Sequence, residues 1–207
     1  MKGLLKVTLS DLQEAIQNPR AFVRNQGVSR SGFKRNRYME LRDAALGFHK
    51  DNDINLSVAA LEERLQKFKT VRGNDGYVEK LREYASRFEE LGTAVARVRN
   101  NITLPTPDEY AQFRVTGQVA RLDLHPAGGY RAWLFASKTE QWRDELRFPI
   151  MQAACANQLG VDVEEIVPGV YDFSTGAYTV VQSSKRKVQE ARRQLLSVLD
   201  EMKKYRP

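Results

Sequence analysis

The sequence has very few of the residues that build disulfides and zinc sites. Among 207 residues it contains one cysteine, Cys155, and two histidines, His49 and His125. A single thiol cannot close an intramolecular disulfide, and it offers no thiolate cluster for zinc. The two histidines are far apart in the chain and do not have the spacing of metal ligands. We therefore expect no disulfide and no zinc centre, with Cys155 buried on an apolar helix face.

Long apolar runs are also missing. The first residues, MKGLLKVTLSDLQ, contain no apolar run long enough for a signal peptide, and no later stretch could span a bilayer. We therefore expect a cytoplasmic protein without a membrane partner. The apolar content of 42% is close to the globular average, and the length suits a single domain over residues 1–207.

Acidic residues are outnumbered, and the formal net charge is +7. Much of the excess lies in residues 20–42, where Glu40 is the only acid and Phe22, Phe33 and Tyr38 are interspersed. Cations displace counterions from nucleic-acid phosphates, and aromatic rings stack on bases. The segment predicts either a nucleic-acid contact or a solvated basic loop, because a charge cluster alone does not identify a partner. Its seven basic residues are Arg20, Arg24, Arg30, Lys34, Arg35, Arg37 and Arg42.

Residues 1–103 are predicted to be helical for the most part. Apolar residues recur at intervals of three and four in four segments, and Ser57 is a candidate cap for the third. Pro19 should end or kink the first segment. The short RGNDG break between the last two predicts an antiparallel helical hairpin. The four predicted helices cover residues 8–18, 38–50, 57–68 and 76–99.

Residues 104–207 differ from the first half in composition and in the pattern of their apolar residues. β-Branched and aromatic residues predict strands over residues 113–124, 130–137, 165–173 and 177–183, with hairpin-like breaks at HPAGGY and STGA. Helices are predicted over residues 140–160 and 183–205, the second capped by Ser183 or Ser184. The order is therefore strand, strand, helix, strand, strand, helix. We expect an α/β or α+β fold, in which a mixed sheet of about four strands is flanked by helices and covered by the helical N-terminal half.

The first pair of strands has the layout of a metal-dependent nuclease site without its acids. Residues two apart in a strand share a face, so Ala136 lies beside Lys138, and Gln118 beside Ala120. Phosphodiester hydrolysis with a hard cation needs carboxylates to hold the metal and a nearby lysine to orient the attacking water. An Asp-x-Lys at one strand end with an Asp on the neighbouring strand would meet that need. Here alanine stands at both acid positions.

This pattern resembles the RecB-like nuclease domains of the PD-(D/E)XK superfamily, with its restriction-endonuclease-like fold. Such domains read G-x-hydrophobic-D-R-hydrophobic-D, then two hydrophobic residues before D-Y-K-T, then Q-x-x-x-Y, where this chain has GQVARLD, LFASKT and QAACA. NPRAF, at residues 18–22, resembles an early CP-x-x-F, and GFH, at residues 47–49, an early Gly…His element. The residues that match are Gly117, Arg121, Asp123, Lys138, Thr139 and Gln152.

The departures bear on catalysis. Ala120, Ala136 and Ala156 replace the two acids and the tyrosine of the pattern. Magnesium binds through carboxylates and its own waters, so it has no evident site. Asp123 lies three residues from Ala120 and should face the other side of the strand unless a bulge intervenes. Loss of the acids, relocation to Asp123, Glu140 or Asp144, and deliberate replacement of Ala120 and Ala136 all remain open.

Three hypotheses follow from the sequence. In the first, the chain is a non-catalytic nuclease relative that binds DNA or other nucleic acid, or serves as a subunit of a complex for DNA repair, recombination or defence. It then needs no cofactor, Asp123, Lys138 and Gln152 are remnants of a catalytic site, and phosphates contact the basic segment with Arg121 and Lys138. In the second, rearranged acids and Lys138 form an active nuclease that uses Mg²⁺ or Mn²⁺. In the third, the old active-site face binds another protein.

Overall fold

The computed structural model describes residues 4–25, 35–68, 73–137 and 145–205. Within these residues the chain forms six strands and seven α-helices, in a mixed α/β arrangement. The strands are β1 (Leu5–Thr8), β2 (Ala94–Leu104), β3 (Phe113–Leu124), β4 (Tyr130–Ala136), β5 (Ile166–Asp172) and β6 (Ala177–Val180). The helices are α1 (Leu12–Gln17), α2 (Pro19–Asn25), α3 (Arg37–Asp51), α4 (Ile54–Leu65), α5 (Asp75–Leu91), α6 (Arg147–Leu159) and α7 (Lys185–Tyr205).

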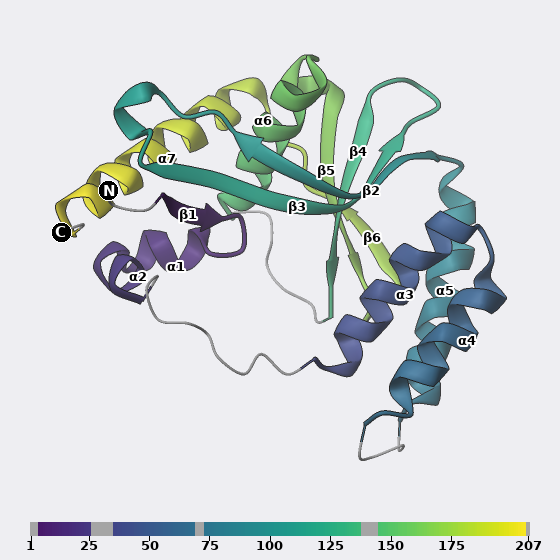
Figure 1. Ribbon diagram of the computed structural model, residues 1–207. Helices are drawn as coiled ribbons and strands as arrows, with labels where there is room; N and C mark the ends of the chain where they lie inside the picture. Colours follow the sequence, from purple (N-terminus) through teal and green to yellow (C-terminus); the bar gives the residue numbers. More distant parts are fainter. Residues whose placement is uncertain (1–3, 26–34, 69–72, 138–144, 206–207) are drawn as a thin grey trace.

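All six strands belong to one mixed sheet, in which β3 is the central element (Figure 1). β1 and β5 run parallel to their neighbours β3 and β4, whereas the pairs β2–β3, β3–β4 and β5–β6 are antiparallel. β3 pairs with three strands. On one edge its first residues pair with β1 and its last residues pair with β4, whereas β2 pairs with most of the opposite edge. The sheet therefore divides at the middle of β3, where the first edge has neither β1 nor β4 as a partner.

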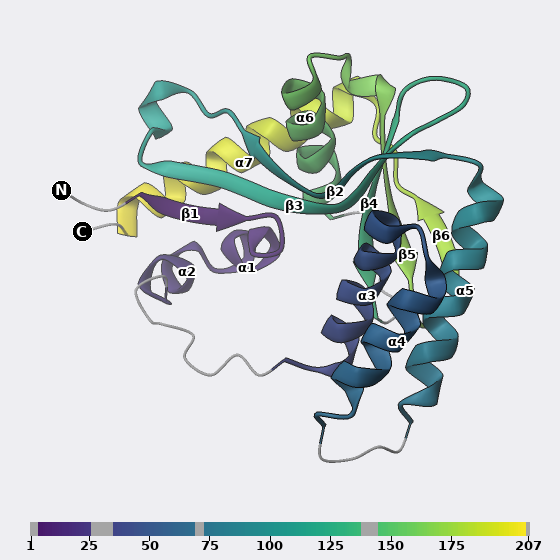
Figure 2. The ribbon, with the colours of Figure 1, turned by 45° about the vertical axis from the view of Figure 1, so that its right-hand side comes forward.

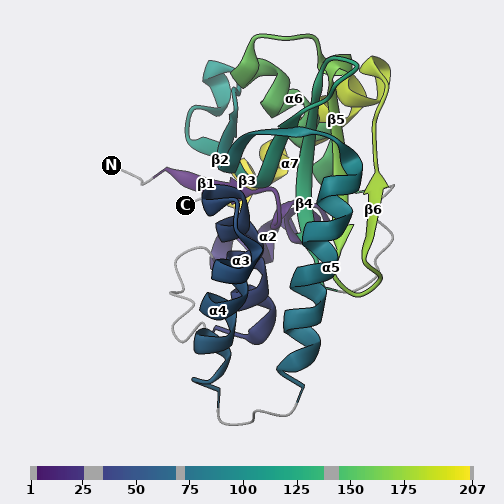
Figure 3. The ribbon, with the colours of Figure 1, turned by 90° about the vertical axis from the view of Figure 1, so that its right-hand side faces the viewer.

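Helices cover both faces of the sheet. Val170 and Tyr171 are neighbours in β5 and must face opposite sides. Val170 belongs to a main core formed with α1, α2, α6 and α7, and Tyr171 belongs to a second core formed with α3, α4 and α5. Figures 2 and 3 show the second group as a separate helical layer beside the sheet. The predicted α/β class and the helical cover are thus confirmed.

The second half follows the predicted order of elements, from β3 and β4 through α6 to β5, β6 and α7. The hairpin of α4 and α5 is also present, and Ser184 caps α7 through the backbone N–H of Lys187. The cap of α4 is Asp53, not Ser57, which lies inside the helix. No helix among the described residues is long and apolar enough to cross a bilayer.

Two predictions for the first half were wrong. The helix expected over residues 76–99 ends at Leu91, because Gly92 adopts a left-handed φ of 58° and the chain then enters β2. The sheet consequently has six strands where about four were expected. The other missed strand, β1, is only four residues long, and its buried Leu5 and Val7 alternate with exposed Lys6.

Candidate functional site

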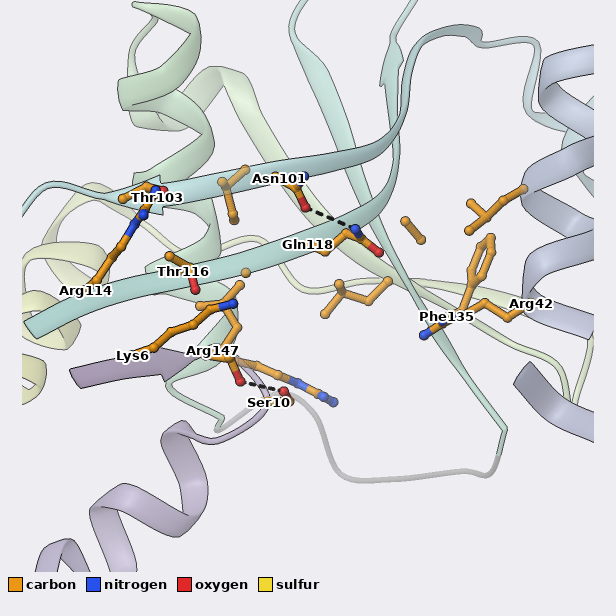
Figure 4. A pocket seen from close by; sticks show the side chains of 17 residues that line it. Lys6, Ser10, Arg42, Asn101, Thr103, Arg114, Thr116, Gln118, Phe135 and Arg147 are labelled. Atoms are coloured by element: carbon orange, nitrogen blue, oxygen red, sulfur yellow. Dashed lines mark hydrogen bonds between the residues drawn. The ribbon is translucent and has the colours of Figure 1, made fainter. Parts of the chain in front are cut away.

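A cavity of about 720 Å³ lies over β1, β2 and β3, in the part of the sheet that the α3–α5 layer leaves uncovered. Ser10 forms part of one wall and Arg42 of α3 part of another (Figure 4), and their neighbours Leu9 and Leu46 also line the cavity. Arg147, at the start of α6, also reaches it. We call this cavity the groove.

The floor of the groove consists of side chains in three successive rows. Strand register pairs Lys6 with Arg114, then Thr8 with Thr116 and Thr103, then Gln118 with Asn101. Side chains alternate along β3, so these residues point into the groove while Phe113, Val115 and Val119 enter the main core. The floor therefore runs from a cationic row through a hydroxyl row to an amide row, in which Gln118 donates to Asn101 at 3.0 Å.

The charge of the groove has one sign. Four basic residues line it, and none of its described lining residues carries a carboxylate. Lys6 and Arg114 are exposed, and neither makes an ion pair within the described part of the chain. Arg42 lies 3.7 Å from Asp43, and Arg147 lies 2.6 Å from Glu145, so these two charges are partly compensated. The uncompensated positive charge is thus concentrated on the Lys6–Arg114 row.

Beyond the amide row the floor becomes apolar. Ala120, Leu134 and Phe135 line this end, opposite Leu46 of α3. It lies where the sheet divides, since β1 pairs with β3 only as far as Thr116 and β4 begins to pair at Arg121. Gly117 lies in this gap. A Cβ there would stand 2.4 Å from Cδ1 of Leu9, so glycine allows the groove wall to approach β3 closely.

Of the two expected acid positions, Ala120 lies on the floor at this apolar end. Ala136, the last residue of β4, does not line the groove and packs against the main core. Among the described residues, no three Asp, Glu, His or Cys side chains gather in a way that could hold a metal ion. Lys138, Glu140 and Asp144 lie outside the described residues.

Asp123, the remaining acid of the pattern, does not line the groove. Val119 and Leu122 both enter the main core, which breaks the strict alternation next to Ala120, and Arg99 on the neighbouring strand has a φ of 52°. The irregularity turns Arg121 and Asp123 toward the α3–α5 layer. Both side chains are 0% exposed and form an ion pair of 2.8 Å. Arg121 and Asp123 therefore form a buried ion pair and not an exposed one.

The carboxylate of Asp123 is fully engaged. It accepts from Trp133 Nε1 at 2.8 Å and from Thr93 Oγ1 at 3.2 Å as well as from Arg121. Burial raises the pKa of Asp123, and the Arg121 charge opposes the rise. Trp133 can lie here because Gly169 is beneath it; a Cβ on Gly169 would stand 2.3 Å from the indole ring. These contacts place Asp123 in a structural network and away from any ligand in the groove.

Aromatic residues enclose the guanidinium of Arg121. The rings of Phe88 and Tyr178 lie 4.4 and 5.5 Å from its Cζ, and its Nη1 donates to Tyr84 Oη at 2.5 Å. His49 Nε2 lies 3.2 Å from the same nitrogen and 2.5 Å from Tyr84 Oη. Burial, followed by the charge of Arg121, lowers the pKa of His49 to about 3. Nε2 of a neutral His49 has one lone pair, which faces both the Tyr84 hydroxyl and the Arg121 guanidinium. The Arg121 side chain is buried, so it cannot reach a phosphate in this conformation.

Gln152, the third expected remnant of a catalytic site, is also buried. Its Nε2 donates to the carbonyls of Val163 and Ser183, at 2.8 and 3.0 Å. Its Oε1 accepts from the backbone N–H of Ser183 at 3.0 Å. Gln152 thus ties α6 to the segment that precedes α7. Its neighbours Cys155 and Ala156 are buried as well, and burial raises the pKa of the Cys155 thiol to about 12.

The basic segment is divided among several roles. Arg35 pairs with Glu40 and Asp43, and Arg37 donates to Asn74 at 2.9 Å while its Cζ lies 5.0 Å from the Phe68 ring. These contacts hold both side chains against α3 and its neighbours.

Two other residues of the segment stay exposed on α2. They are Arg24 and Arg20, whose Cζ lies 5.9 Å from the Tyr205 ring. Arg30 and Lys34 fall outside the described residues. Of the segment's described cations, Arg42 alone lines the groove.

Sequence reasoning did not single out Lys6 or Arg114. They are adjacent only because a short parallel strand pairs with β3. The detectable signal was the alternation in FRVTGQV, whose polar positions carry Arg114, Thr116 and Gln118. Lys6 had no comparable signal, since its strand has four residues.

Comparison with known proteins shows a likeness of fold. No protein-family model and no curated protein matches the sequence. The fold is similar to a crystal structure from Eubacterium rectale described as "Putative exonuclease", with a TM-score of 0.53 and 9% sequence identity. The match covers 96% of this chain and 81% of the other. At this identity the likeness concerns the fold, and the narrower resemblance to the PD-(D/E)XK superfamily stays a prediction.

Proposed function

We propose that this protein binds nucleic acid in the groove and does not cleave it. The observation that carries the proposal is the composition of the groove: four basic residues and a floor of hydroxyl and amide groups, with no carboxylate among the described lining residues. Cations and hydrogen-bond donors of this kind contact phosphate and sugar oxygens, and these contacts give affinity without sequence choice. The nuclease-like fold supports the same class of ligand.

The absence of cleavage is inferred from the position of the acids. Ala120 occupies the floor at the divide of the sheet, and Asp123 is held in the buried network with Arg121. A hard cation binds weakly to a site without carboxylates. Membership of a complex for DNA repair, recombination or defence belongs to the same proposal and depends on partners still to be identified.

The test is a combined binding and cleavage assay with labelled single- and double-stranded DNA and RNA. If all four groove cations contact phosphates of a single strand, raising the salt from about 50 to about 200 mM should weaken binding by about 50-fold. Affinity that ignores salt would refute the binding proposal. Each substrate is also incubated with Mg²⁺, Mn²⁺ or a chelator. Metal-dependent cleavage that is lost in Lys138→Ala would refute the absence of catalysis.

A further inference from the structure

The groove has an internal order that suggests how a ligand lies in it. Its free charge is at the Lys6–Arg114 row, whereas Ala120, the position of a missing acid, is at the apolar end. The two ends are six residues apart on β3, which corresponds to about 20 Å at the rise of a strand. A phosphate bound by Lys6 and Arg114 would therefore be far from Ala120, where the resemblance to nucleases would place an acid.

We propose that Lys6 and Arg114 form a phosphate-binding subsite that anchors one strand of nucleic acid along β3. This inference rests on the proposed function and names its principal contact. Paired strands hold the two cations side by side on the exposed face, so both can approach one phosphate. Each lacks a carboxylate partner within the described part of the chain, so no ion pair must break when an anion binds.

The hydroxyl row supplies one further donor next to the cations. Thr8 is not that donor, because its hydroxyl donates to Oδ2 of Asp11 at 2.6 Å and is also bonded to the Ser10 hydroxyl at 2.8 Å. Oγ1 of Thr116 is buried and has no hydrogen-bond partner among the described residues. A rotation of the Thr116 side chain would let this hydroxyl donate to a phosphate oxygen. An unsatisfied buried hydroxyl is unusual in proteins, and a bound anion or water would satisfy it.

The dimensions of the groove favour a single strand. Walls stand on two sides, and a volume of about 720 Å³ is in the range of cavities that enclose a small ligand, which is too small for a duplex. A floor of about 20 Å is as long as about six stacked nucleotides at a rise of about 3.4 Å each, so a strand would run along the floor with only part of each nucleotide inside the cavity. The apolar end would then receive a base, and the amide row would contact sugar or base edges.

The experiment compares two doubly neutralised variants of the full chain. Lys6→Gln/Arg114→Gln removes the proposed subsite. Arg192→Gln/Arg193→Gln removes the same charge from exposed positions on α7, the helix that packs in the main core. Binding of oligothymidylates of increasing length is measured by fluorescence anisotropy, together with the salt dependence. Thermal unfolding of each variant verifies that it is folded.

The wild type and the α7 variant should gain affinity with length up to about six nucleotides and then level off. The Lys6/Arg114 variant should bind the longer oligomers about tenfold or more weakly, and level off at a shorter length. Its loss of affinity between about 50 and about 200 mM salt should fall from about 50-fold to about 7-fold, as expected when two phosphate contacts are removed.

Equal losses in the two variants would overturn the subsite, because charge alone would then explain binding. An unchanged length dependence in the Lys6/Arg114 variant would overturn it too, as would a preference for duplex over single strand in the wild type. If the wild type binds no nucleic acid at all, the proposed function itself fails. That result is distinct from a wild type that binds and a variant that binds equally well.

Discussion

Replacing Asp123 by asparagine removes the negative partner of a guanidinium that is enclosed by aromatic rings. The side chain keeps its size and can still accept from Trp133 and Thr93, so the main change is an uncompensated charge on Arg121. Breaking a buried ion pair in this way costs about 3–5 kcal/mol. For a chain of this length, that corresponds to a fall of roughly 6–20 °C in the unfolding midpoint.

The assay is thermal and urea unfolding followed by circular dichroism. Glu190→Gln is the matched control, because it neutralises the carboxylate of the exposed Arg186–Glu190 pair on α7 and should leave the midpoint unchanged. The double variant Arg121→Met/Asp123→Asn should be more stable than Asp123→Asn alone, since the unpaired charge is gone.

The outcome separates two roles for Asp123. A metal-binding carboxylate would be dispensable for folding, and its removal would often stabilise the chain. An Asp123→Asn variant within about 0.5 kcal/mol of the wild type would refute the structural role argued above. A double variant less stable than the single variant would refute it as well.

Three further predictions concern the packing around the site. The pKa of His49 is about 3 in the folded protein and near 6.5 when exposed, so the unfolded chain binds the extra proton. Stability therefore falls as the pH drops from about 6.5 toward 3, and the loss caused by His49 is about 2 kcal/mol at about pH 5. Urea unfolding of the wild type and His49→Gln above about pH 6.5 and at about pH 5 measures this loss, and a difference between the two proteins that is independent of pH would contradict it. Gln152→Leu leaves the buried N–H and C=O of Ser183 without a partner and should cost about 2–4 kcal/mol in the same assay; a neutral result would mean that water replaces the amide. Gly169→Ala should displace the Trp133 ring, cost about 1–3 kcal/mol and shift the tryptophan emission, whereas an unchanged spectrum would show that the ring has room.

Local patterns predicted the elements that depend on local physics. The stripe of α7 and the order from β3 to α7 could be read from periodicity and turn residues. The same rule failed after Leu91, because Val95 and Val98 also fit a helical spacing, whereas the left-handed Gly92 ends the helix and the partner β3 makes residues 94–104 a strand. Strand pairing is a tertiary property that a periodic pattern does not contain.

The site shows the same limit. Residues two apart in a strand share a face, as Arg121 and Asp123 do, but nothing in the strand itself reveals the helical layer that buries them. The basic cluster in residues 20–42 was visible as composition, yet Arg35 and Arg37 are held by Glu40 and Asn74. Net charge along the chain does not show which cations are compensated in the fold.

Helix α3 links the groove to the buried network around Arg121. Arg42 and Leu46 form a wall of the groove, and His49, on the next turn, is bonded to Arg121. Positions 42, 46 and 49 lie along one side of a helix, so the buried bond fixes the rotation of the helix that forms the wall. The contact of His49 with Arg121, which a ligand in the groove would not touch, therefore helps to position this wall of the groove. Selection for a different ligand could act on His49 or its partners as effectively as on the groove, and would change folding stability at the same time.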